Sequence, residues 1–200
     1  GSEMCIRDRA ASLRYHKDTF YVCFASYDTG KTYIYRTKNI NEPWEKRSLD
    51  GVYHHPSLLF DEDGRIYMGY GFNEVRILEL NDTLTAPKEG GFERLLVEEK
   101  QDAYISYEGA HFYKKDGTYY IFVIQWLKGN LTQREQLCLY GDSLDGEFKK
   151  EMVFSENLGF PMKGVAQGGI VDTPEGDWYS VMYQEHGAIG KMPVLVPVSW

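Results

Sequence analysis

The sequence is short of cysteine, of positive charge and of long hydrophobic runs, and each shortage excludes a class of protein. Three cysteines, Cys5, Cys23 and Cys138, form neither an even disulfide set nor a CxxC pair, so free thiols are the simpler interpretation. Lysine and arginine number 22 against 30 aspartates and glutamates, and this net charge of −8 disfavours nucleic acid and anionic membranes as partners. The longest apolar runs, such as residues 119–124, fall far short of the roughly 20 residues that cross a bilayer.

Apolar and aromatic side chains, by contrast, are plentiful. Of the 200 residues, 42% are hydrophobic and 15% are aromatic, which is enough for a single globular unit with a sizeable core. Residues 1–9, GSEMCIRDR, lack the alternation that begins at Ala10, so we interpret them as a non-native leader and residues 10–200 as one domain. Residues 198–200 lie within an apolar run, and we expect this domain to be partial.

Four segments of the chain align with one another without gaps. Each has a small residue, an apolar strand, a turn, and a strand with a tyrosine three positions after the turn glycine. In the first copy Asp18 replaces that glycine, which is permitted because aspartate tolerates positive φ better than most residues. The segments are ASLRYHKDTFYVCFAS from Ala11, SLLFDEDGRIYMGYG from Ser57, AHFYKKDGTYYIFVI from Ala110 and GIVDTPEGDWYSVMYQ from Gly169.

The spacing of these hairpins predicts the architecture. The turn positions 18, 64, 117 and 176 lie 46, 53 and 59 residues apart, close to the length of a propeller blade with variable loops. A further strand and turn follow the signature hairpins, which predicts four-stranded blades, and no segment has the 3.6-residue apolar period of a long helix. A β-sandwich would not need the same hairpin four times. We therefore expect an all-β propeller.

Polar side chains stand at one shared position of the repeat. Arg9, His55, Glu108 and Gln167 all lie nine positions before the turn, two positions before the small residue. The symmetry of the repeat places them at one mouth of the central channel, and two-residue alternation points them the same way. Polar groups that converge from separate blades make a ligand site, although an arbitrary strand glutamate is more often solvated.

These segments resemble the motifs of a known enzyme family. YEGAHFYKKDGTYYIF, residues 107–122, resembles the Glu-Gly-Pro-His-x-Tyr-Lys-x-x-Gly-Tyr-Tyr-Tyr motif of glycoside hydrolase family 43, and ASLRYHKDTFYV, HPSLLFDEDGRIYMGYG and residues 167–200 resemble three further motifs in the same order. The resemblance implies a five-bladed β-propeller, here incomplete with about four blades. It also implies a glycosidase that hydrolyses O-glycosyl bonds in arabinose- and xylose-containing polysaccharides or oligosaccharides without a cofactor.

The family's inverting mechanism uses a general acid, a general base and a carboxylate that tunes the acid. Glu108 matches the general acid, which must be protonated to donate to the leaving-group oxygen. His55 stands at the position of the tuning aspartate, where an imidazole would lower rather than raise the pKa of a nearby glutamate. The base lies upstream of the matched segment and has no counterpart. Aspartates in the hairpin turns have structural explanations there: Asp61, Asp63, Asp116 and Asp172.

Three further residues are expected to contact the sugar. Gln167 stands where the family often has a channel histidine, and we expect it to hydrogen-bond a sugar hydroxyl. Arg134 resembles an arginine that contacts the bound sugar, with a solvent-facing role as the alternative. Trp126 is expected to stack on a sugar ring, with packing at the end of a strand as the alternative.

No metal site is expected, and three functions stay open. The adjacent His54 and His55 are weak as a metal pair because neighbouring strand residues point to opposite faces. The first function is the pentose-directed glycosidase, with the activity of these 200 residues alone left open. The second is a propeller that binds glycan without cutting it, which the two missing acidic residues favour. A protein-interaction propeller of the kelch kind explains the blades but not the motifs.

Overall fold

The computed structural model describes residues 8–98, 103–129, 133–160 and 164–200, and strands dominate these residues. Within the described ranges, the one helical element is the short 3-10 turn η2 (Gly187–Ile189), so the expectation of no long helix is confirmed. None of the helical structure described is long and apolar enough to cross a bilayer. The all-β class predicted from the hairpins is confirmed.

The strands form four antiparallel sheets, each with its strands in chain order. We call these sheets blades 1 to 4. Blade 1 holds β1 (Asp8–His16), β2 (Thr19–Ser26), β3 (Lys31–Thr37) and β4 (Glu45–Asp50); blade 2 holds β5 (Ser57–Phe60), β6 (Ile66–Tyr70), β7 (Glu74–Leu80) and β8 (Glu93–Glu98); blade 3 holds β9 (Ala103–Lys115), β10 (Thr118–Leu127), β11 (Glu135–Gly141) and β12 (Lys149–Phe154); blade 4 holds β13 (Ala166–Asp172), β14 (Trp178–Glu185) and β15 (Lys191–Val198).

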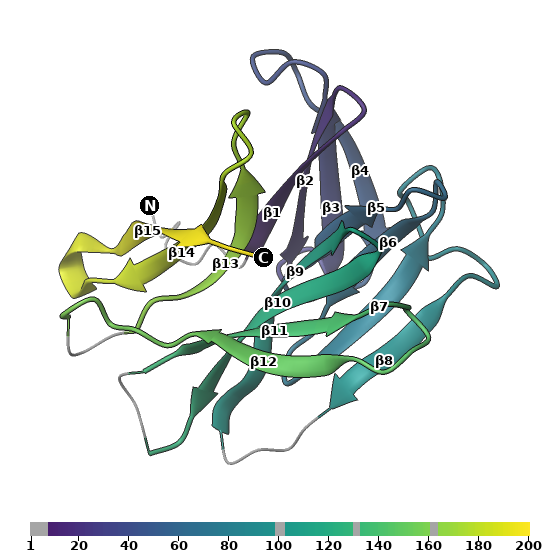
Figure 1. The fold of residues 1–200 in the computed structure, drawn as a ribbon. Coiled ribbons are helices and arrows are strands. Elements are labelled where there is room, and N and C mark those ends of the chain that lie inside the picture. Colours follow the sequence, from purple (N-terminus) through teal and green to yellow (C-terminus); the bar gives the residue numbers. More distant parts are fainter. Residues whose placement is uncertain (1–7, 99–102, 130–132, 161–163) are drawn as a thin grey trace.

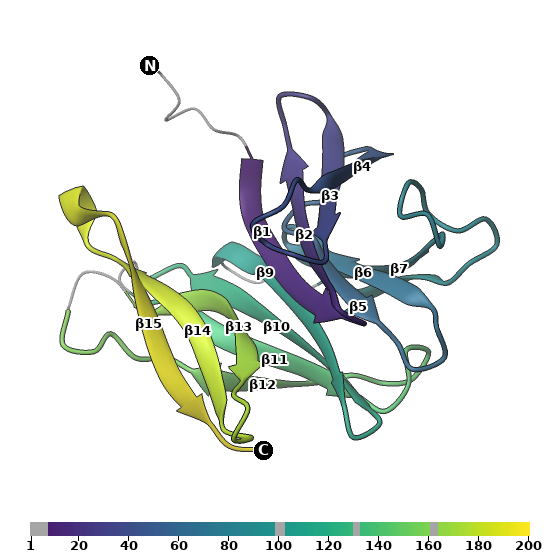
Figure 2. The same cartoon turned by 90° about the horizontal axis from the view of Figure 1, so that it is seen from above.

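The blades are arranged around a common centre (Figures 1 and 2). The first strand of each blade, β1, β5, β9 or β13, lies innermost, and neighbouring innermost strands contact one another. The later strands of each blade lie farther out (Figure 1). This is the propeller arrangement predicted from the repeat, with four blades in the described residues. Blade 4 has three described strands rather than the expected four.

The hairpins between the first two strands of each blade are of two lengths. In blade 1, His16 pairs with Thr19 around Lys17 and Asp18, which have φ of 46° and 58°. The replacement of glycine by Asp18 in a positive-φ turn is therefore confirmed. Blade 3 has the same two-residue turn at residues 116–117. Blades 2 and 4 instead have five-residue turns, between Phe60 and Ile66 and between Asp172 and Trp178, so the two-residue hairpin does not extend to them.

The hydrophobic core lies between neighbouring blades. One cluster joins blades 1 and 2, a second joins blades 2 and 3, and a smaller third joins blades 3 and 4. Cys23 and Cys138 are buried in two of these clusters as free thiols, as expected. Burial raises the pKa of Cys23 well above its ordinary value and that of Cys138 to about 12. Cys5 lies outside the described residues.

Side chains from one blade bind the backbone of the next along the inner edges. Ser12 Oγ donates to the Pro56 carbonyl at 2.7 Å, and the Phe112 N–H donates to Ser57 Oγ at 3.0 Å. The Ile170 N–H donates to the Tyr113 hydroxyl at 2.9 Å. Because an innermost strand has a partner strand on one side only, these bonds satisfy backbone groups that would otherwise lose hydrogen bonds on burial.

Arg14 joins three blades at once. From β1, its Nε donates to the Leu58 carbonyl at 3.0 Å, and its Nη2 donates to Ser57 Oγ at 2.6 Å and to the Phe112 carbonyl at 3.1 Å. Its guanidinium also stands 4.2 Å from the centre of the Tyr113 ring. The planar fork of arginine suits this use, since one group serves acceptors in several directions.

The start of the chain bears on the expected domain boundary at Ala10. Residues 1–7 of the expected leader lie outside the described residues, while β1 begins at Asp8 and the backbone of Arg9 pairs with Ala25. The assignment of residues 1–9 to a leader stays a prediction.

Asp61 illustrates why the turn aspartates are structural. It is 4% exposed and accepts hydrogen bonds from Lys114 Nζ, the Tyr119 hydroxyl and the Glu62 N–H, each at 2.6 Å. Burial raises its pKa, but these three donors outweigh burial and hold the pKa below its ordinary value. Lys114 and Tyr119 belong to blade 3, so Asp61 ties the turn of blade 2 to the neighbouring blade.

We expect Asp61→Asn to destabilise the fold by about 2 to 3 kcal/mol at pH 7, because it removes a largely buried ion pair. A carboxyl whose folded pKa is depressed stabilises the fold above its unfolded pKa of about 3.9, and this contribution is lost as the pH falls through the folded pKa. The difference in the free energy of unfolding between the unaltered protein and Asp61→Asn, measured with urea, should therefore become smaller below about pH 4. Glu62→Gln, at an exposed neighbouring side chain, is the matched control. A difference in the free energy of unfolding that does not change with pH would contradict this role for Asp61.

Candidate functional site

Glu108 lies on β9 where the strand is irregular. It pairs with Ile124 of β10, and the register shifts on both sides of that pair. Gly109, the next residue, has a φ of 75°. Such bulges re-aim a side chain, and positive φ is open to glycine at little cost. A Cβ at residue 109 would lie 2.7 Å from Gln167 Cγ, so glycine is also needed for space.

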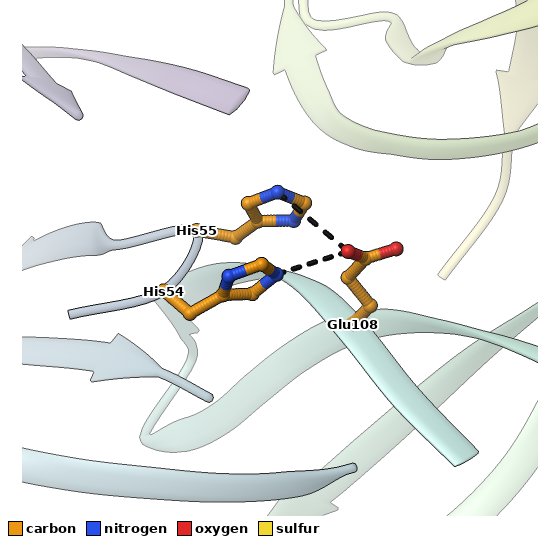
Figure 3. Close-up of side chains that lie close together, drawn as sticks. All are labelled: His54, His55 and Glu108. Atoms are coloured by element: carbon orange, nitrogen blue, oxygen red, sulfur yellow. Dashed lines mark hydrogen bonds and ion pairs between the residues drawn. The ribbon is translucent and has the colours of Figure 1, made fainter. Parts of the chain in front are cut away.

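Two histidines meet this glutamate from the loop that precedes β5. His54 Nε2 lies 2.9 Å and His55 Nε2 lies 3.7 Å from Glu108 Oε1, as Figure 3 shows. The two rings stack with their centres 3.9 Å apart and 18° between their planes. The expectation that His54 and His55 point to opposite faces is wrong. They do not lie in a strand, and His55 has a φ of 49°, which turns its ring to the same side as that of His54.

Each imidazole has a second partner through its Nδ1 atom. The Tyr27 hydroxyl forms a short hydrogen bond with His54 Nδ1. Gln167 Nε2 lies 3.1 Å from His55 Nδ1, and the Tyr183 hydroxyl donates to Gln167 Oε1 at 2.8 Å. Tyr27 follows β2, the histidines precede β5, Glu108 is on β9 and Gln167 is on β13. Side chains from all four described blades therefore converge here, as the register of the repeat predicts for His55, Glu108 and Gln167.

The cluster is largely buried but keeps some exposure to solvent. Side-chain exposure is 14% for His54, 6% for His55 and 13% for Glu108. Two aromatic side chains next to His54 are more exposed, Tyr27 at 42% and Phe72 at 48%. The arrangement offers a carboxylate, two imidazoles and an amide to a ligand, with apolar ring faces beside them. The side chain of Arg9, the fourth member of the predicted set, is outside what the structure describes.

Arg134 and Trp126 form a separate group at the same end of blade 3. The Arg134 guanidinium stands 5.0 Å from the centre of the Trp126 ring, and Nη2 pairs with Glu185 Oε2 at 3.2 Å. Arg134 is 8% exposed, so the solvent-facing alternative is excluded. Trp126 also packs against Tyr104 at 5.5 Å between ring centres. The structure brings these two predicted residues together, and their role toward a sugar stays a prediction.

His111 stays neutral within the same inner strand. Burial first, and then the nearby guanidinium of Arg14, lower its pKa to about 3. Gly169 of blade 4 faces it so closely that a Cβ there would lie 2.8 Å from His111 Nδ1 and 2.1 Å from the Tyr113 hydroxyl oxygen. This crowding gives the physical reason for the small residue predicted at position 169.

The sequence reasoning did not assign two residues of the site, Tyr27 and His54. The signal for Tyr27 is its offset, because it lies nine positions after the turn (27 − 18), as Trp126 does in blade 3 (126 − 117). The second strand of each hairpin returns to the end from which the first one started, so this offset reaches the mouth. The signal for His54 is absent from the sequence, since a regular strand at residues 54–55 would point its ring away from that of His55.

The comparisons with known proteins agree with the motifs. The sequence model described as "Glycosyl hydrolases family 43" matches residues 3–200. A "Beta-xylosidase" of Formosa agariphila is 25% identical over 218 residues, covering 96% of this chain and 36% of that protein. A "Xylosidase/arabinosidase" of Butyrivibrio fibrisolvens is 26% identical, covering 91% of this chain and 38% of that protein.

Solved structures share the fold. "Bifunctional GH43-CE Bacteroides eggerthii" is 37% identical with a TM-score of 0.86, covering 96% of this chain and 24% of that one. The chain spans 36% to 38% of the length of the curated relatives it matches.

We expect Gly109→Ala to destabilise the protein more than Gly64→Ala does. Both glycines have positive φ, of 75° and 84°. Alanine in this left-handed backbone conformation costs about 1 to 2 kcal/mol of stability at either position. At Gly64 nothing lies within 4 Å of the added Cβ, whereas at Gly109 the Gln167 side chain must move. Urea unfolding of the two variants measures the difference. Equal losses of stability would show that Gln167 does not need the space beside Gly109.

Proposed function

The chain belongs to glycosyl hydrolases family 43, and from this premise we propose that it acts as a glycosidase on arabinose- or xylose-containing polysaccharides or oligosaccharides. The printed names of its relatives, a beta-xylosidase and a xylosidase/arabinosidase, support this substrate class. The ordered motifs over residues 10–200 support the same reaction, the hydrolysis of O-glycosyl bonds.

The observation that carries the proposal is the position of Glu108. Its carboxyl group stands where side chains from four blades meet, and the side chain is 13% exposed, so a glycosidic oxygen can reach it. In its protonated form Glu108 donates to the leaving-group oxygen and so lowers the cost of breaking the bond. The exposed rings of Tyr27 and Phe72 offer apolar faces for sugar rings.

The other predicted residues take supporting roles in this proposal. The Gln167 amide lies at the mouth, within reach of a sugar hydroxyl, and is held in place by His55 and Tyr183. The Arg134 guanidinium lies 5.0 Å from the centre of the Trp126 ring, and this cation–π contact limits the movement of both side chains. The N–H donors of Arg134 are therefore held in a fixed direction. We propose that these two residues contact a neighbouring part of the glycan.

One observation favours a second function, a propeller that binds glycan without cutting it. His55 occupies the position of the family's tuning carboxylate, and His54 Nε2 lies 2.9 Å from Glu108 Oε1. An imidazole N–H that donates to this oxygen favours the ionised carboxylate, which has no proton to give. Sugar binding through the exposed aromatic rings does not need that proton.

Glu108→Gln should lower the turnover of xylo- and arabino-oligosaccharides by at least about 100-fold, because glutamine cannot donate the required proton. The loss should be smaller for 4-nitrophenyl pentosides, whose leaving group needs less protonation. Glu62→Gln, at a glutamate side chain that is 88% exposed, is the control and should leave turnover unchanged. Equal turnover by the Glu108→Gln variant and the unaltered protein would rule Glu108 out as the acid.

Calorimetry separates the two functions. We expect xylo- or arabino-oligosaccharides to bind, and Tyr27→Ala and Phe72→Ala each to weaken binding because an exposed ring face is lost. Leu13→Ala, at another exposed hydrophobic side chain, is the control. Binding with turnover supports the glycosidase, and binding without turnover supports the second function. No heat with any of these sugars would contradict both.

A further inference from the structure

We propose that His54, His55 and Glu108 form a binding site for a divalent transition metal ion of the Zn²⁺ class. One ligand atom from each residue, the two imidazole nitrogens and a carboxylate oxygen, lies within 4.8 Å of the other two. Figure 3 shows the two imidazole rings side by side, with the Glu108 carboxylate next to them. The sequence interpretation expected no metal here because it placed the two histidines on opposite faces, and the structure removes that reason.

The distances between the ligand atoms suit a tetrahedral ion. Two ligands bonded to Zn²⁺ at 2.0–2.1 Å with a tetrahedral angle are about 3.4 Å apart. The distances from Glu108 Oε1 are 2.9 Å to His54 Nε2 and 3.7 Å to His55 Nε2, one on each side of that value. These two distances therefore need to change by about half an ångström at most, and the imidazole nitrogens lie within 4.8 Å of each other.

The backbone and the neighbouring side chains hold the imidazoles for this use. The positive φ of His55 and the stacking of the two rings hold the imidazoles side by side, so that a rotation of the His55 ring is the main adjustment that an ion would require. Metal-binding histidines usually give their other N–H to an acceptor, and this contact fixes the ring. The Tyr27 hydroxyl is such an acceptor beside His54 Nδ1.

Gln167 can serve His55 in the same way. Its amide lies 3.1 Å from His55 Nδ1, and a half-turn of the amide puts its oxygen there. The Tyr183 hydroxyl, which donates to the Gln167 oxygen in the present orientation, can equally accept from the amide nitrogen after that turn. Both second partners are therefore compatible with imidazoles that bind a metal through Nε2.

The kinds of ligand atom and their burial select the ion. Two imidazoles and one carboxylate suit Zn²⁺ and its neighbours better than Ca²⁺ or Mg²⁺, which prefer sets of oxygen ligands. Three protein ligands leave a fourth position for water or a substrate oxygen. Side-chain exposures of 13% to 14% for Glu108 and His54 leave a path from solvent.

Metal binding would regulate the proposed activity, and this consequence rests on the proposed function. A carboxylate that coordinates Zn²⁺ cannot also carry the proton that a leaving group needs. Occupancy of the site therefore inhibits hydrolysis that depends on Glu108. Glycan binding at the exposed rings of Tyr27 and Phe72 does not require the carboxylate and is expected to continue.

The test is calorimetric titration of the 200-residue chain, free of any affinity tag, with Zn²⁺. We expect one ion per chain at micromolar affinity or tighter, and at least tenfold weaker binding in His54→Gln, His55→Gln and Glu108→Gln. His16→Gln is the matched control, since this histidine stacks on Phe60 at the hairpin end of β1, and it should leave the affinity unchanged. Thermal unfolding without metal confirms that each variant is folded.

A second measurement does not depend on the variants. Co²⁺ in place of Zn²⁺ should give the intense visible absorption of a tetrahedral N₂O site, and Zn²⁺ should abolish it by displacement. Absence of binding to the unaltered chain, or equal binding by all four variants, would overturn the proposal. If the chain binds Zn²⁺ but neither cuts nor binds pentose glycans, the metal site is supported and the proposed function is contradicted. If the chain hydrolyses pentose glycans, does not bind Zn²⁺ and is not inhibited by it, the proposed function is supported and the metal site is contradicted.

Discussion

The inner edge of each blade imposes the constraint on which this molecule depends. An innermost strand pairs with one neighbour only, so its other edge carries backbone groups that need partners. Ser12, Ser57 and Tyr113 supply those partners from the preceding blade, and Arg14 supplies them to two blades together. These bonds fix how neighbouring blades sit against one another, and the candidate site is built on or next to the same inner strands.

Much of the fold follows from the local chemistry of the hairpins. Glycine or aspartate at positive φ marks each first turn, and tyrosines at a fixed offset mark the strands that follow, so the repeat and its all-β class are visible in the sequence. Turn length is less visible, because the five-residue turns of blades 2 and 4 have the same glycine at the same offset. Asp61 stabilises its turn through Lys114 and Tyr119 of another blade, and such distant partners leave no local pattern.

The site was predictable where the strands obey the repeat and not where they depart from it. His55, Glu108 and Gln167 share an offset from their turns, and the structure brings them together. His54 and Tyr27 were missed because a positive φ at His55 and the return of β2 depend on backbone geometry rather than on composition. The two proposals assign competing chemistries to the Glu108 carboxylate, proton donation to a sugar and coordination of a metal.

Ser57 connects the packing of the blades with the cluster. It accepts from the Phe112 N–H and from Arg14, and it lies two residues after His55, while Phe112 lies four residues after Glu108. The position of β5, which the two histidines precede, relative to β9, which holds Glu108, is thus set in part by a serine that is not one of the ligands. Because the partner of Ser57 on β9 is a backbone N–H, any side chain at residue 112 keeps this bond, whereas replacing the serine hydroxyl would let the two strands slide and move the histidines away from Glu108.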